Sequence, residues 1–173
     1  MSRYLIGAVA LFSALFVLPA PARAADPVVL GVYGQWKALA FDEAKGKVCF
    51  MSAKPQKQED KFKKRGDVAF FITHWAGEGT RDVISVSIGY AFKKGSTLDV
   101  TIDGKTHKMA TDGEMAWAAD SATDQTIAAA VRKGSKLVIK GVSSRGTQTT
   151  DTYSLEGSGE AYDKISTECG FKP

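Results

Sequence analysis

The segment KLVIKGVSSRGTQTTDTYSLEG, residues 136–157, contains two β-forming runs on either side of the turn-forming residues 143–146. The run before the turn has apolar side chains at Leu137, Ile139 and Val142. Because side chains alternate along a strand, one face of the second run carries Thr149, Asp151, Tyr153 and Leu155. The segment therefore predicts a β-hairpin with the composition of central strands.

Similar β-forming runs recur through the preceding part of the chain. The strongest are Asp67–Trp75 and Asp82–Phe92, and Asp103-Gly104 predicts a hairpin between 97–102 and 105–110. Residues Val28–Phe41 predict one strand with a bend near Trp36, followed by a short strand at 48–51. Many short strands separated by turns predict a β-sandwich, with a closed barrel as the alternative.

Only two segments favour a helix. Residues Ser121–Lys133 are rich in helix formers, have Ser121 or Thr123 as a possible cap, and stop at Gly134. Ile127 and Val131 are expected on its inner face, and residues 158–166 predict a second, short helix. The expected fold is therefore mainly β with one or two short helices.

The first 24 residues are typical of a secretory signal peptide. Arg3 precedes an apolar run at 5–18, and two prolines lead into the small-residue pattern at 22–24. A membrane anchor is the alternative, but the apolar run is short and is followed by helix-breaking prolines. We therefore expect cleavage before Ala25, export, and one domain over residues 25–173, with no transmembrane segment in it.

The charge of the chain gives little reason to expect a nucleic-acid partner. The sequence has 23 basic and 19 acidic residues, and removal of Arg3 and Arg23 with the signal lowers the net charge from +4 to +2. The lysine-rich segment 53–67 contains interleaved acids and one aromatic residue, Phe62. We expect a solvated loop there, with contact to an anionic partner as the alternative.

Cys49 and Cys169 are the only cysteines in the chain. Export would place them in an oxidising compartment, so we expect a disulfide between them; two unpaired buried thiols are the alternative. A redox-catalytic pair is disfavoured because the sequence has no C-x-x-C spacing.

No residue pattern in the sequence points to catalysis, a metal or a cofactor. His74 and His107 are the only histidines, and there is no Gly-x-Ser-x-Gly motif. We expect a protein without enzymatic activity, and keep a small exported hydrolase that uses His74 or His107 as the alternative. Asp151 is interpreted as a structural carboxylate, paired locally with Arg145 or a backbone N–H, because an unpaired buried carboxylate is costly.

Several of these residues together resemble the invasion-associated locus B family of exported bacterial proteins. The similarity runs from about Val32 to Cys169 and includes Trp36, Cys49, Ile88-Gly89-Tyr90, 141–147 and 151–157. Its most specific residues are Arg145, Gly146, Thr147, Asp151, Thr152, Tyr153, Ser154 and Leu155.

The resemblance implies an immunoglobulin-like β-sandwich in the periplasm, the secreted fraction or the outer envelope, and some members are linked to host-cell entry and virulence. It supplies no catalytic or cofactor-binding residues. The sequence thus predicts an exported binding protein whose partner is an unidentified protein or envelope component. Its oligomeric state is left open.

Overall fold

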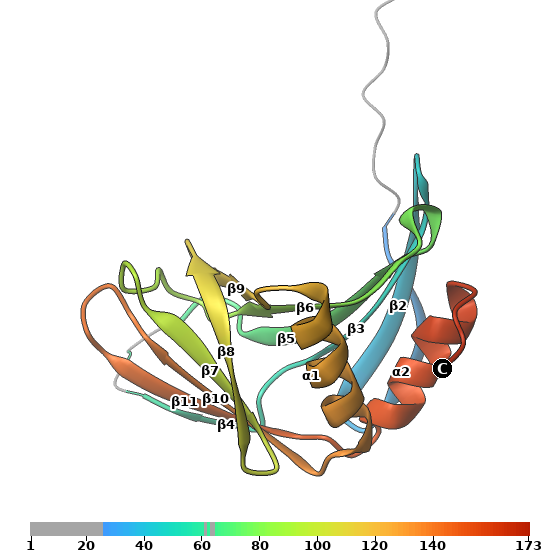
Figure 1. The fold of residues 1–173 in the computed structure, drawn as a ribbon. Helices are drawn as coiled ribbons and strands as arrows, with labels where there is room; N and C mark the ends of the chain where they lie inside the picture. Colours follow the sequence, from blue (N-terminus) through green and yellow to red (C-terminus); the bar gives the residue numbers. More distant parts are fainter. Residues whose placement is uncertain (1–25, 61, 63–64) are drawn as a thin grey trace, which may run out of the picture.

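A computed structural model describes residues 26–60, 62 and 65–173 of the chain. The predicted signal peptide, residues 1–24, lies outside the described residues. Within them, eleven strands form one antiparallel sheet in the order β1-β2-β3-β5-β6-β9-β8-β7-β10-β11-β4 (Figure 1). In chain order, the strands are β1 (Val28–Tyr33), β2 (Trp36–Glu43), β3 (Gly46–Ala53), β4 (Lys57–Glu59), β5 (Ala69–Trp75), β6 (Thr80–Ser87), β7 (Thr97–Ile102), β8 (Lys105–Asp112), β9 (Met115–Trp117), β10 (Lys136–Val142) and β11 (Gln148–Ser154).

The hairpin predicted from residues 136–157 is confirmed as β10 and β11. Ile139 pairs with Asp151, and β10 also pairs with β7, so this strand has a neighbour on both sides. The alternating residues Thr149, Asp151, Tyr153 and Leu155 are all buried. Their shared face points into the core because of the two-residue period of the strand.

The region Val28–Phe41 is two strands, so the prediction of a single bent strand is wrong. The chain reverses at Gly34-Gln35, and the irregularity expected near Trp36 lies instead between Val29 and Gly31. Gly34 has a φ of 58°, and a Cβ there would lie 2.8 Å from the carbonyl oxygen of Glu156. A side chain is therefore excluded at Gly34 both by backbone conformation and by close approach.

Two α-helices, α1 (Ser121–Lys133) and α2 (Ser158–Glu168), and the short 3₁₀ helix η1 (Ala76–Glu78) complete the described secondary structure. The bounds of α1 agree with the prediction, but its cap is Asp120, whose side chain accepts a hydrogen bond from the Thr123 N–H at 2.7 Å. Carboxylates are good caps because they satisfy free N–H groups of the first turn.

The helices lie together against one part of the strongly bent sheet (Figure 1). Helix α1 packs on β6, and α2 packs on β1, β2 and β3. Ile127 and Val131 of α1 are buried, as expected from their spacing. The prediction of a mainly β fold with short helices is confirmed, and a sandwich is consistent with this continuous sheet.

Candidate functional site

Cys49 and Cys169 form a disulfide, with Cα atoms 6.0 Å apart. Cys49 lies in β3, and Cys169 directly follows α2. The bond therefore ties the C-terminal helix to an early strand across a sequence separation of 120 residues.

Asp151 is paired with Arg65, a residue of the segment predicted to be a solvated loop. Arg65 Nη1 and Nη2 donate to the two carboxylate oxygens of Asp151 at 2.7 and 2.8 Å. Nη1 also donates to Asp60 at 2.9 Å, and Nε and Nη2 donate to the Ile88 carbonyl. The side chain of Asp151 is fully buried and that of Arg65 is only 6% exposed. This bidentate geometry is the strong form of an arginine–carboxylate pair.

The ring of Tyr90 lies against the buried arginine and itself stacks on Phe62. The Arg65 guanidinium carbon lies 5.3 Å from the ring centroid of Tyr90, and Phe62 stacks on the same ring at 5.1 Å. The Tyr90 hydroxyl is 2.7 Å from Thr149 Oγ1. Burial alone would lower the pKa of Arg65, but the hydrogen bonds and charges of Asp151 and Asp60 raise it. Arg65 is therefore a permanent buried cation. We call Asp60, Arg65, Tyr90, Thr149 and Asp151 the Arg65 cluster.

Asp151 is buried and paired, which is consistent with a structural carboxylate, but the expected local partner Arg145 was wrong. Arg145 is exposed in the β10–β11 turn, whereas Arg65 reaches Asp151 from 86 residues away. No spacing rule connects such distant positions. The sequence gives one weak indication that Arg65 could enter the core, which is its position just before Gly66 and the apolar strand β5. This position does not distinguish Arg65 from the neighbouring lysines.

The second polar cluster surrounds His74, which is fully buried in β5. Its Nδ1 accepts a hydrogen bond from the backbone N–H of Asp82 at 3.0 Å, and its Nε2 is 3.1 Å from Ser166 Oγ. The Asp82 carboxylate accepts from the Tyr162 hydroxyl at 2.6 Å and from Arg81 Nε at 2.9 Å. The sequence had indicated neither Ser166 nor Asp82 as a neighbour of this histidine.

The hydrogen bonds of His74 run in the opposite direction to those of the catalytic histidine in a serine hydrolase. Because Nδ1 accepts the Asp82 N–H, the ring proton of neutral His74 lies on Nε2 and is donated to Ser166. A general base needs a free electron pair on the nitrogen that faces the serine, and a carboxylate at the other nitrogen. Both are missing here, and Ser166 is fully buried.

His107 is half-buried in β8 and has no hydrogen bond to a serine or a carboxylate among the described residues. Its Nε2 and the hydroxyl of Tyr153 are buried atoms without a partner in that part of the chain. Burial lowers the pKa of His107, with a further contribution from Lys105, and burial raises the pKa of Tyr153. Among residues 26–60, 62 and 65–173, neither histidine therefore belongs to a nucleophile–base–acid set.

The loss of protein stability in acid tests whether His74 is neutral in the folded protein. Burial lowers the pKa of His74 below its ordinary value of 6.5, and the charge of Asp82 only partly opposes this. In acid, His74 of the unfolded chain binds a proton that folded His74 does not. The contribution of His74 to the free energy of unfolding is therefore complete above about pH 6.5 and is lost as the pH falls. We expect His74→Gln to reduce the dependence of the free energy of unfolding on pH, measured by urea denaturation between about pH 7 and 5.

His107→Gln is the companion variant, since the pKa of His107 is also lowered. The two substitutions together are expected to remove more of the pH dependence than either one. A pH dependence that is unchanged in His74→Gln would contradict a buried neutral imidazole.

The residues of the family resemblance do not converge on one reactive point. Arg145 and Gly146 are exposed in the turn, and the Thr147 N–H donates to Ser143 Oγ at 3.1 Å. Asp151, Tyr153 and Leu155 point into the core, while Thr152 and Ser154 are half-buried on the other face of β11. The Ser154 carbonyl accepts a hydrogen bond from Trp36 Nε1 at 3.1 Å. Most of this motif thus packs one strand against the core.

Two further kinds of site are absent from the described ranges. No group of three or more His, Cys, Asp or Glu side chains there could hold a metal ion. In the same part of the chain, neither α-helix has the length and apolar character required to cross a bilayer.

The fold and these clusters define a small, mainly β protein with one disulfide and a buried ion pair between Arg65 and Asp151. The family model for the invasion associated locus B (IalB) protein matches residues 36–166, most of the chain. The chain belongs to the IalB family. No curated protein and no solved structure matches it significantly. Family membership and the disulfide both fit an exported protein.

Proposed function

We propose that the protein is a non-enzymatic binding protein of the bacterial envelope or the secreted fraction. The observation that carries this proposal is the orientation of His74, which donates to Ser166 and therefore cannot act as its base. Membership of the IalB family supports a role in the envelope, and contact with a host cell is one form that this role can take. A cleaved signal peptide over residues 1–24 is part of the proposal.

The edge strand β1 is the surface that best fits an extended protein partner. Three of the four large exposed apolar side chains in the described part of the chain, Val28, Val29 and Val32, lie on it. The opposite edge, β4, has three exposed residues with the sequence Lys-Gln-Glu. Charged, short edges resist pairing with another strand, whereas long apolar edges favour it. We therefore propose that a partner segment adds to the sheet along β1.

Crosslinking in the native compartment tests this proposal. The protein is expected to fractionate with the periplasm, outer membrane or medium, and to yield one saturable crosslinked partner. Val29→Lys should reduce that crosslink at least several-fold, because it places a charge in the apolar contact. The matched control, Gln58→Lys, adds the same charge to the β4 edge and should leave the crosslink unchanged.

Equal crosslinking by both variants would contradict the β1 contact. The absence of any saturable partner, together with turnover of an ester or peptide substrate that disappears in Ser166→Ala, would overturn the non-enzymatic assignment in favour of a hydrolase.

A further inference from the structure

A cavity of about 480 Å³ lies between the beginning of β6, the exposed face of α1, and α2. Helix α1 lines it with residues that recur at about one-turn spacing: Gln125, Ala129, Arg132 and Lys133. Residues at this spacing share one face of a helix, and the opposite face of α1 is buried against the core. The small side chain of Ala129 leaves room between the longer polar ones.

Two arginines of this cavity are held in place by Tyr162 of α2. The Arg132 guanidinium carbon lies 5.2 Å from the Tyr162 ring centroid, and Arg132 Nη2 lies 2.7 Å from Asp163 Oδ1. On the other side, Arg81 donates to the Tyr162 hydroxyl and to the Lys172 carbonyl. Both guanidinium groups are therefore ordered before any ligand arrives, which lowers the entropic cost of binding.

The charges around the cavity do not cancel. Four cationic side chains line it, Arg81, Arg132, Lys133 and Lys172. The carboxylates in contact with these arginines are Asp82 and Asp163. Both oxygens of Asp82 are already hydrogen-bonded, to Tyr162 and to Arg81. Pro173 also lines the cavity, and its terminal carboxylate adds a third negative charge. Four cations and three carboxylates leave an excess of one positive charge, and the N–H groups that the arginines do not use in these contacts remain for another anion.

We propose that this cavity binds a phosphate group. Ordered guanidinium groups form paired hydrogen bonds with phosphate oxygens, lysine ammonium groups add mobile positive charge, and the Gln125 amide supplies a further donor. Free phosphate and the headgroup of a phospholipid present the same chemistry to these residues. This inference does not depend on the proposed function, because the cavity is formed by other residues than the β1 edge.

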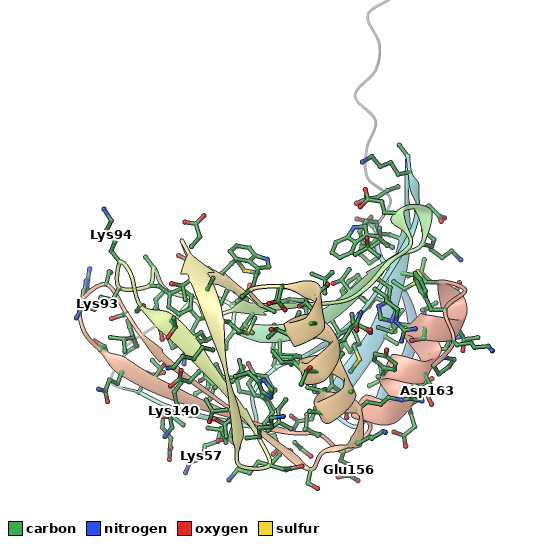
Figure 2. The ribbon with its side chains drawn as sticks, viewed as in Figure 1. Lys57, Lys93, Lys94, Lys140, Glu156 and Asp163 are labelled. Carbon is green, nitrogen blue, oxygen red and sulfur yellow. A yellow bond between two sulfur atoms is a disulfide. The ribbon has the colours of Figure 1, made fainter. Side chains whose placement is uncertain are left out.

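Titration of the purified protein with inorganic phosphate, followed by NMR chemical shifts, tests the site. Resonances of α1 and Tyr162 are expected to shift in a saturable way, and Arg132→Gln should weaken binding about tenfold or more. Lys140→Gln is the matched control, since it removes one charge from β10. Lys140 and Asp163, the neighbour of Arg132, lie on opposite sides of the view in Figure 2.

Sedimentation with vesicles separates the two sources of phosphate. Binding to vesicles that contain phosphatidic acid but not to pure phosphatidylcholine, lost in Arg132→Gln, would assign a lipid headgroup; phosphate binding without vesicle binding would assign a free ligand. If Arg132→Gln does not fold, the double variant Lys133→Gln/Lys172→Gln replaces it. Equal weakening by Lys140→Gln, or no saturable shift with phosphate, would overturn the proposal.

Discussion

Replacement of Arg65 by methionine is expected to lower the free energy of unfolding by about 3–5 kcal/mol. The reason is that Asp151, which is fully buried, would lose both hydrogen bonds from the guanidinium group and become an uncompensated charge. Methionine keeps much of the volume that packs against Tyr90, so the loss reports on charge pairing more than on packing. Equilibrium denaturation in urea, monitored by tryptophan fluorescence, measures it.

Arg145→Met is the matched control for this experiment. It removes the same side chain from an exposed turn of the same sheet, so its effect should remain within about 0.5 kcal/mol. Asp151→Asn should also be destabilising, and combining it with Arg65→Met should cost less than the sum of the two changes. A stability that is unchanged in Asp151→Asn would contradict the structural role of this carboxylate.

Loss of the disulfide is the second large effect that we expect. Replacement of both Cys49 and Cys169 by alanine should cost about 2–5 kcal/mol, because the unfolded chain is released from a long covalent loop. The bond joins β3 to the end of α2 with a sequence separation of 120 residues, so the C-terminal helix should also become more sensitive to proteolysis. The midpoint of urea denaturation, measured with and without a thiol reductant, tests the prediction.

The double alanine variant provides its own control. Reductant should shift the denaturation midpoint of the natural chain toward that of the variant, and should leave the variant unchanged. A natural chain with the same midpoint under both conditions, once reduction is verified by thiol titration, would contradict a stabilising role for the bond.

The lysine-rich segment 53–67 is more closely tied to the folded core than its composition predicts. The segment was expected to be solvated throughout, yet Arg65 leaves it to enter the core, and residues 57–59 pair with β11. The remaining lysines of its described part, Lys54 and Lys57, are exposed. Ala53 at the other end of the segment is buried in β3. Both ends are therefore part of the folded core, so changes to the length of the segment are expected to affect stability as well as surface charge.

Local residue patterns predicted most of the strands and both helices, but not the turn that divides Val28–Phe41 or the short strand β4. The alternation in β11 placed Thr149, Asp151, Tyr153 and Leu155 on one buried face, and the spacing of Ile127 and Val131 identified the inner face of α1. Both predictions succeed because strand and helix periodicity depend on neighbours within a few residues. The pairing of the two cysteines followed from their number and from the expected compartment.

The partners of the buried polar groups depend instead on how distant segments meet. Arg65 reaches Asp151 over 86 residues, and His74 reaches Ser166 over 92. The turn at Gly34-Gln35 also depends on such a contact, since Gly34 lies against Glu156. The sequence by itself determined most of the strands and both helices, because periodicity is local. Only the tertiary structure decided which charges and hydrogen-bonding groups are paired, because a buried polar group must find its partner in space and not along the chain.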